Sequence, residues 1–87
     1  MEKRHQDNLT NRLEEAHLVG CSHLAWEELY LWYGVQKIAA RTYRDLEDRW
    51  QALTEGKLGE LMKIDGRGGI FVFGEKKAKA VVPNGNG

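Results

Sequence analysis

The sequence predicts one small domain that is mainly α-helical and carries a small β-hairpin at its C-terminal end. Apolar residues recur at helical spacing in three segments of the first 54 residues. Residues 61–73 instead alternate around a glycine-rich turn, which is typical of a hairpin. The chain has 87 residues, 41% hydrophobic and 30% charged, a balance that suits one thin core and excludes wholesale disorder.

The first helix is expected over residues 8–19. Leu9, Leu13 and Ala16 recur at intervals of four and three, so they share one face of a helix. Asp7 or Asn8 is suited to cap the start, and Gly20 is suited to end the helix. We expect the polar residues 1–7 to form a flexible N-terminus.

The second helix is expected over residues 23–33, between a capping serine at Ser22 and a terminating glycine at Gly34. Its apolar positions are Ala25, Leu29, Trp32 and Tyr33, with Leu24 and Leu31 on a second stripe. Because these residues cover much of the circumference, this helix is predicted to be the most buried element.

The third helix is expected over residues 38–54. The positions predicted to face the core fall within a narrow sector of the helix: Ala39, Tyr43, Leu46, Trp50 and Leu53. The opposite face carries two arginines and two aspartates, Arg41, Arg44, Asp45 and Asp48. The spacing predicts three ion pairs four residues apart, which are Arg41–Asp45, Arg44–Asp48 and Asp45–Arg49.

Two short strands follow, at residues 61–64 and 70–73. The intervening segment 65–69 contains three glycines, which supply the backbone angles that a hairpin turn needs. Residues 76–87 are expected to be a tail that is first basic and then rich in glycine and asparagine, and therefore flexible.

Two motifs carry a resemblance to a known superfamily. Residues 40–46, Ala-Arg-Thr-Tyr-Arg-Asp-Leu, resemble the start of the recognition helix in GntR-type and DeoR-type bacterial repressors. Residues 66–72, Gly-Arg-Gly-Gly-Ile-Phe-Val, resemble the wing of GntR-type repressors. The resemblance covers residues 8–75 and implies a three-helix winged helix-turn-helix domain. The chain departs from the helix-turn-helix pattern at Tyr30, where alanine is frequent.

The formal net charge is zero, with 13 basic and 13 acidic residues, but the charge is unevenly distributed. Residues 1–30 have an acidic excess of three, residues 31–56 are balanced, and residues 57–87 have a basic excess of three. A zero net charge argues against attachment to nucleic acid by bulk positive charge. Any DNA binding is therefore expected to come from the third helix and the hairpin.

The resemblance implies duplex DNA as the partner. The candidate contacts in the major groove are Gln36, Lys37, Arg41, Thr42 and Arg44, because the start of the third helix enters that groove and arginine can bind guanine bidentately. Arg67 is expected in the minor groove or on its phosphates, and Lys63, Lys76 and Lys77 on phosphates. A homodimer is expected, because one module reads few base pairs. The expected role is transcriptional regulation in the cytoplasm.

An alternative function is a protein-interaction module, such as an adaptor or a small inhibitor. On this hypothesis the charged side chains of the third helix only form a surface exposed to solvent. Trp26 and Tyr30 lie four residues apart at the edge of an apolar helix face, and their exposure would mark a partner or dimer surface.

Other chemistry is not expected. His17, Cys21 and His23 are metal-ligand types, but a structural zinc site takes four ligands, so we expect no metal and a buried thiol at a helix junction. The sequence shows no catalytic constellation, so we expect neither an enzyme nor a cofactor. The single cysteine cannot form an intrachain disulfide, which favours a reducing compartment. No apolar run approaches the roughly 20 residues that span a bilayer, so no membrane partner is expected.

Overall fold

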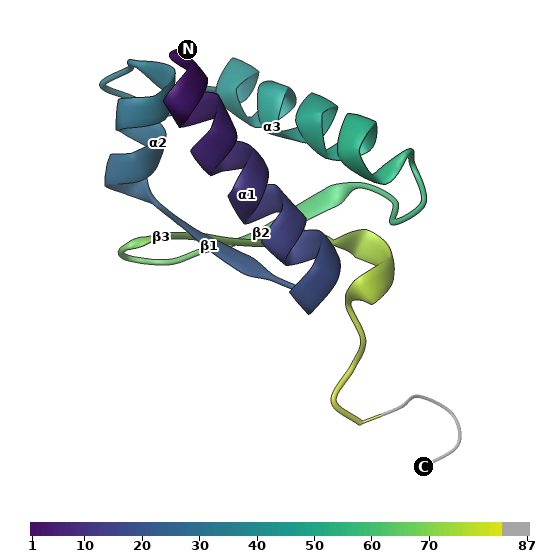
Figure 1. The fold of residues 1–87 in the computed structure, drawn as a ribbon. Coiled ribbons are helices and arrows are strands. Elements are labelled where there is room, and N and C mark those ends of the chain that lie inside the picture. The colour runs from purple at the N-terminus through teal and green to yellow at the C-terminus, as the bar shows by residue number, and fades with distance from the viewer. Residues whose placement is uncertain (83–87) are drawn as a thin grey trace.

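A computed structural model describes residues 1–82 of the chain. It contains three α-helices and a three-stranded antiparallel sheet, with a short 3₁₀ helix after the last strand (Figure 1). In chain order the elements are α1 (Lys3–Val19), β1 (Ser22–Ala25), α2 (Trp26–Tyr33), α3 (Ala40–Thr54), β2 (Leu61–Asp65), β3 (Gly69–Gly74) and η1 (Glu75–Lys77). The prediction of three helices and a C-terminal hairpin is confirmed, but the sheet has a third strand.

The sheet order is β1-β3-β2, so the last strand lies between the other two. β1 pairs with β3 in the register Leu24↔Ile70, and β2 pairs with β3 in the register Lys63↔Val72. Helices α1 and α3 cover one face of this sheet, and the core lies between them and the strands (Figure 1). The buried apolar side chains are Leu9, Leu13, Ala16, Leu24, Leu29, Trp32, Leu46, Trp50, Ile70 and Val72.

The first helix starts at Lys3 rather than at residue 8, so the expectation of a flexible segment over residues 1–7 is wrong. His5 is buried one turn before Leu9, which continues the apolar face of α1 toward the N-terminus. The predicted end is confirmed, because Gly20 has a φ of 119° and its N–H donates to the Ala16 carbonyl. Only glycine adopts that backbone angle without strain.

Residues 23–25 were expected in a helix but form strand β1. Leu24 faces the core in this strand, while His23 on the other face contacts Phe71, with ring centroids 4.7 Å apart and ring planes tilted by 51°. The Ser22 hydroxyl donates to Glu15 Oε1 and caps no helix. The strand exists because β3, more than 40 residues later, supplies its hydrogen-bonding partner. A pattern read along a short window of sequence cannot detect that partner.

The interior of α3 differs in part from the predicted set. Leu46 and Trp50 are buried as expected, Tyr43 and Leu53 are only partly buried, and Ala39 is exposed. Two threonines, Thr42 and Thr54, take inward positions, and the Thr54 hydroxyl donates to the Trp50 carbonyl at 2.9 Å.

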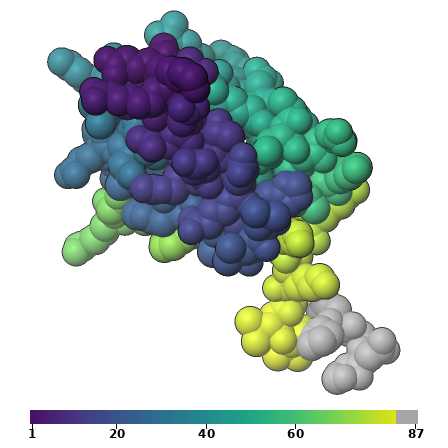
Figure 2. Space-filling model, viewed as in Figure 1, coloured from purple at the N-terminus to yellow at the C-terminus, as the bar shows by residue number. Residues whose placement is uncertain are grey.

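The C-terminal end is described as far as residue 82. Lys76 and Lys77, expected in a flexible tail, lie in η1. Residues 78–82 carry no helix or strand and extend from the body of the molecule (Figure 2). The asparagine- and glycine-rich stretch that was expected to be flexible, residues 83–87, lies outside the described residues.

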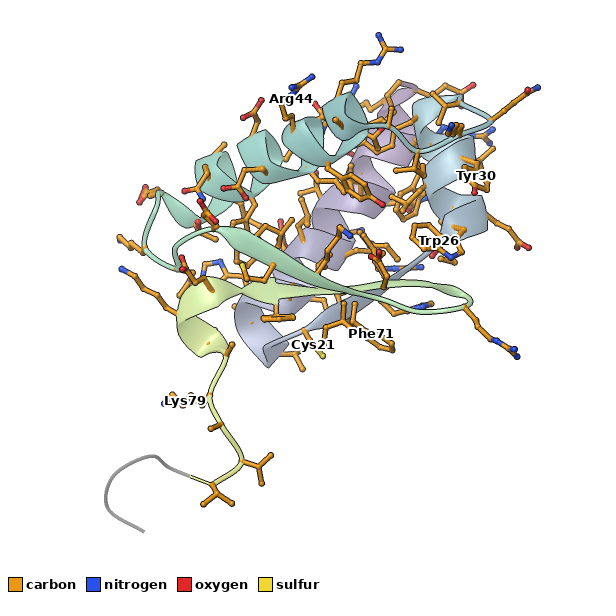
Figure 3. All side chains as sticks on the ribbon, turned by 180° about the vertical axis from the view of Figure 1, so that it is seen from behind. Cys21, Trp26, Tyr30, Arg44, Phe71 and Lys79 are labelled. Atoms are coloured by element: carbon orange, nitrogen blue, oxygen red, sulfur yellow. The ribbon has the colours of Figure 1, made fainter. Side chains whose placement is uncertain are left out.

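The outer face of the sheet is apolar. Ile64 is 59% exposed, Phe71 46% and Met62 39%. These residues alternate with inward-facing ones, and Figure 3 shows Phe71 and Cys21 on the side of the sheet away from the helices. The outer face of an antiparallel sheet is commonly polar, so these exposed apolar residues mark a candidate interaction surface.

Across residues 1–82, the helices lack the length and apolar character needed to cross a bilayer.

Candidate nucleic-acid interface

The N-terminal half of α3 presents two arginines to solvent. Arg41 and Arg44 are exposed, and within residues 1–82 neither forms an ion pair. Figure 3 shows Arg44 pointing away from the sheet. Gln36 and Lys37 are exposed in the turn that precedes this helix. All four side chains are therefore accessible, and two of them are guanidinium groups that form no ion pair within residues 1–82.

Asp45 pairs with residues other than Arg41. The Asp45 carboxylate accepts hydrogen bonds from the Tyr33 hydroxyl at 2.7 Å and from Arg49 Nε at 2.6 Å. Burial by itself would raise the pKa of Asp45, but these two hydrogen bonds outweigh it, so the pKa lies below its usual value. Of the three predicted pairs, Asp45–Arg49 is confirmed, whereas Arg41–Asp45 and Arg44–Asp48 are wrong.

The Asp45 carboxylate also shifts the pKa of the two residues that donate hydrogen bonds to it. The pKa of Tyr33 is raised well above its usual value, first by burial and then by the hydrogen bond to Asp45. The pKa of Arg49 is raised chiefly by its hydrogen bond to Asp45. Arg49 therefore offsets the negative charge of Asp45 beside Arg41 and Arg44.

A shallow hollow of about 570 Å³ runs beside this part of α3. Arg41 and Arg44 line it on one side, and Met1 and Val35 close it near the start of α1 and the end of α2. Asp48 also lines the hollow, so it is mixed in charge rather than uniformly basic. Asp48 is exposed, so it opposes an anion that approaches the two arginines through this hollow.

Thr42, a predicted DNA contact, is placed differently from the two arginines. Its side chain is only 4% exposed and lies on the inward side of α3. Its backbone N–H donates to the Ala39 carbonyl at the first turn. Thr42 therefore packs the start of the helix against the core.

The β2–β3 hairpin presents Arg67 at its tip, with the side chain exposed. The turn is closed by the Gly66 N–H, which donates to the Gly69 carbonyl at 2.8 Å. Figure 2 shows the hairpin tip standing out from the body of the molecule. Arg67 is thus accessible from several directions.

The three lysines of the candidate site differ from Arg67 in their contacts or in their position on the molecule. Lys63 Nζ lies 2.6 Å from Asp65 Oδ1 and 4.8 Å from the centre of the Tyr43 ring, so it is engaged by two other residues of the protein although it is exposed. Lys76 and Lys77 are exposed in η1, which follows the end of β3 farthest from the hairpin tip. A strand of six residues spans roughly 17–20 Å. The structure therefore does not bring these two lysines together with Arg67.

Trp26 and Tyr30, the predicted partner surface, differ in their surroundings. Tyr30 is 37% exposed. Trp26 is partly buried, packs against the core, and donates from its indole Nε1 to the Gly66 carbonyl at 3.3 Å. Figure 3 places Trp26 next to the hairpin. The two residues are therefore not one free aromatic patch.

Arg12 links α1 to α2, a contact that the sequence analysis missed. Its guanidinium donates to both carboxylate oxygens of Glu28, with Nη1 2.9 Å from Oε1, and also to the His23 carbonyl at 2.8 Å. Burial would raise the pKa of Glu28, but the hydrogen bonds from Arg12 and from the Ala25 N–H lower it overall. The hydrogen bond to Glu28 raises the pKa of Arg12. This link fixes the start of α2, where Trp26 lies.

The possible metal ligands are separated by their packing. His17 lies edge-on to Trp50, with ring centroids 6.3 Å apart, and His23 stacks on Phe71. Cys21 is exposed, so the expectation of a buried thiol is wrong. Within residues 1–82 no three His, Cys, Asp or Glu side chains are grouped to hold a metal ion.

The chain matches no family model, and comparison with curated proteins and with solved structures found no significant match. The candidate interface therefore depends on its geometry: Gln36, Lys37, Arg41 and Arg44 around the start of α3, and Arg67 at the hairpin tip.

Proposed function

We propose that this chain is a small winged helix-turn-helix protein that binds duplex DNA and regulates transcription in the cytoplasm as a dimer. The order of elements supports this proposal: three helices precede a glycine-rich hairpin, and α3 carries the motif that resembles a repressor recognition helix. In this proposal α3 enters the major groove and the hairpin is the wing.

The observation that carries the proposal is the presence on α3 of two exposed arginines that form no ion pair within residues 1–82. Arg41 and Arg44 are three residues apart, so they lie on the same side of the helix one turn apart. A guanidinium group that has no internal ion pair to break can bind guanine O6 and N7, or a phosphate, directly. Of the two acidic neighbours, Asp45 is neutralised by Arg49, whereas Asp48 is exposed and forms no ion pair within residues 1–82.

Arg67 contributes at a second point. An arginine at the end of a narrow hairpin can reach the minor groove or its phosphates. Lys63 is not part of this proposal, because Asp65 and Tyr43 occupy it. In this proposal Lys76 and Lys77 contact phosphates outside the site formed by α3 and the hairpin tip.

The test is fluorescence anisotropy with a mixed-sequence duplex at low salt, and with a duplex enriched from a random library. We expect Arg41→Ala and Arg67→Ala each to weaken binding to the enriched duplex by about 5- to 150-fold, because one arginine contact with a base or groove contributes about 1–3 kcal/mol. The affinity should also fall steeply as salt rises.

Arg4→Ala is the matched control, since Arg4 is an exposed arginine on α1 whose guanidinium already forms an ion pair with Glu2. Its affinity should equal that of the wild type. The proposal would be rejected if the wild type showed no salt-sensitive binding to duplex at low salt, or if Arg4→Ala weakened binding as much as Arg41→Ala.

The apolar outer face of the sheet favours a second candidate function, a protein-interaction module whose partner is a second copy of the chain. Phe71, Ile64 and Met62 are large, exposed and adjacent across β2 and β3. In a symmetric dimer the same surface of both copies meets, so each of these residues occurs twice in the interface. Aromatic side chains contribute strongly to binding at such interfaces.

Sedimentation equilibrium of Phe71→Ser and Tyr30→Ser tests this second function. Both residues are exposed aromatics, at 46% and 37%, but they lie on different surfaces. We expect Phe71→Ser to weaken self-association about 30-fold, as loss of one dominant interface residue does, and Tyr30→Ser to leave it unchanged. A monomeric wild type, or a loss caused by Tyr30→Ser instead, would contradict the assignment.

A further inference from the structure

We infer that Trp26 is a positioning residue that fixes the direction of Arg67 at the hairpin tip. This inference rests on the proposed DNA-binding function for its consequence, but the positioning itself can be measured without DNA. Trp26 is the first residue of α2, and it would act on DNA only through the hairpin.

Two donors of this one residue hold the backbone on both sides of Arg67. The backbone N–H of Trp26 donates to the Gly68 carbonyl at 3.1 Å. The indole Nε1 donates to the Gly66 carbonyl at 3.3 Å. Gly66 precedes Arg67 and Gly68 follows it, so the carbonyls of both neighbouring residues are attached to the start of α2.

The hairpin tip needs such an attachment because its own sequence is flexible. Arg67 is flanked by Gly66, Gly68 and Gly69, which lack the side chains that restrict backbone angles. A freely moving tip would lose conformational entropy whenever Arg67 bound a phosphate or groove, and prior ordering removes that loss. The two hydrogen bonds to Trp26 supply the ordering before DNA is present.

The residue that holds the tip is itself fixed. Trp26 packs against the core, and Glu28 in the same turn accepts from both the Ala25 N–H and the Arg12 guanidinium. The hairpin can approach this point because residue 69 is glycine. A Cβ there would lie 2.2 Å from the Leu24 carbonyl oxygen, a distance that no side chain tolerates.

The side-chain bond is specific to tryptophan among the large apolar residues. Any residue except proline could supply the backbone N–H, but the indole N–H adds a donor at the edge of a ring that also packs in the core. Phenylalanine would keep much of that packing and would lose only the bond to Gly66. Trp26→Phe therefore separates positioning from packing.

A double-mutant cycle of Trp26→Phe and Arg67→Ala, measured by anisotropy on the enriched duplex, tests the inference. With Arg67 present, we expect Trp26→Phe to weaken binding about 2- to 10-fold, the loss that one hydrogen bond explains. In the Arg67→Ala background it should have no effect, because there is no guanidinium to position. Equal losses in both backgrounds, or no loss in either, would overturn the inference.

Tyr30→Phe is the matched control, since it also removes one donor from an aromatic residue of α2, and within residues 1–82 Tyr30 has no hydrogen bond to the hairpin. A lower affinity for Tyr30→Phe would indicate that any change in α2 disturbs the site. Thermal melts of each variant should show that they remain folded at the assay temperature.

A second readout keeps the positioning separate from DNA binding. The heteronuclear NOE of the Gly66 and Gly68 amides should fall in Trp26→Phe and stay unchanged in Tyr30→Phe, with no DNA present. If the wild type fails to bind DNA but these amides loosen, the proposed function is wrong and the positioning stands. If the amides do not change, the positioning is wrong whatever the DNA assay shows.

Discussion

Replacing Trp50 by alanine is expected to lower the free energy of unfolding by about 3–5 kcal/mol, the range observed for loss of a large buried aromatic side chain. Trp50 lies on α3, is 0% exposed, and packs among residues from the helices and the sheet. Its ring also contacts His17 of α1 and leaves little room beside Gly74 of β3. Truncation would open a cavity where these three elements meet, and urea unfolding followed by circular dichroism measures the loss.

Trp50→Phe is the informative companion. Within the described part of the chain the Trp50 indole N–H has no hydrogen-bond acceptor, and an unpaired buried donor costs about 1–3 kcal/mol. Phenylalanine removes that donor and leaves a smaller void, so its destabilisation should be below about 2 kcal/mol. If Trp50→Phe were as damaging as Trp50→Ala, the hydrogen-bond argument would be wrong and the shape of the indole would decide stability.

Replacing Gly69 by alanine is expected to lower the free energy of unfolding by about 3 kcal/mol, the upper end of the usual cost of overpacking. The added Cβ would lie 2.2 Å from the Leu24 carbonyl oxygen and 2.7 Å from the Ala25 Cα, both of which are backbone atoms. The backbone of Gly69 also has a φ of 156°, which side-chain-bearing residues rarely adopt. The clash can be relieved only by moving β1 away from β3, which breaks their hydrogen bonds.

Gly68 provides the matched control one residue earlier. A Cβ at Gly68 meets nothing within 4 Å, and its φ lies outside the left-handed region, so Gly68→Ala should change stability by less than about 1 kcal/mol. Chemical denaturation of the two variants side by side measures the difference. Equal destabilisation by both substitutions would show that loop flexibility, rather than the approach of β1, makes glycine necessary in this turn.

The elements that the sequence predicts well are those whose determinants are local. The hairpin is confirmed because Gly66, Gly68 and Gly69 mark the turn and Ile70 and Val72 alternate with their neighbours. The end of α1 is confirmed because a single residue, Gly20, determines it. Strand β1 is missed because its partner is distant in the chain, while its short sequence is compatible with the start of a helix.

The candidate site also combines features that the local sequence predicts with features that depend on residues distant in the chain. The exposure of Arg41 and Arg44 follows from the helical pattern, and Arg67 follows from the turn. The pairing of Asp45 with Tyr33, of Lys63 with Tyr43, and of Trp26 with the hairpin joins residues that lie 12 to 40 positions apart. Side-chain spacing within one element carries no information about such pairs.

The position of β3 between the other two strands has a consequence for synthesis of the chain. β1 emerges more than 40 residues before the segment that pairs with it, Gly69–Gly74. At roughly 5–20 residues per second, β1 and the inward-facing Leu24 wait for several seconds without their partner. Neither β1 nor β2 can pair until β3 has been made, because β3 is the central strand. Until then β1 is exposed to pairing with strands of other chains.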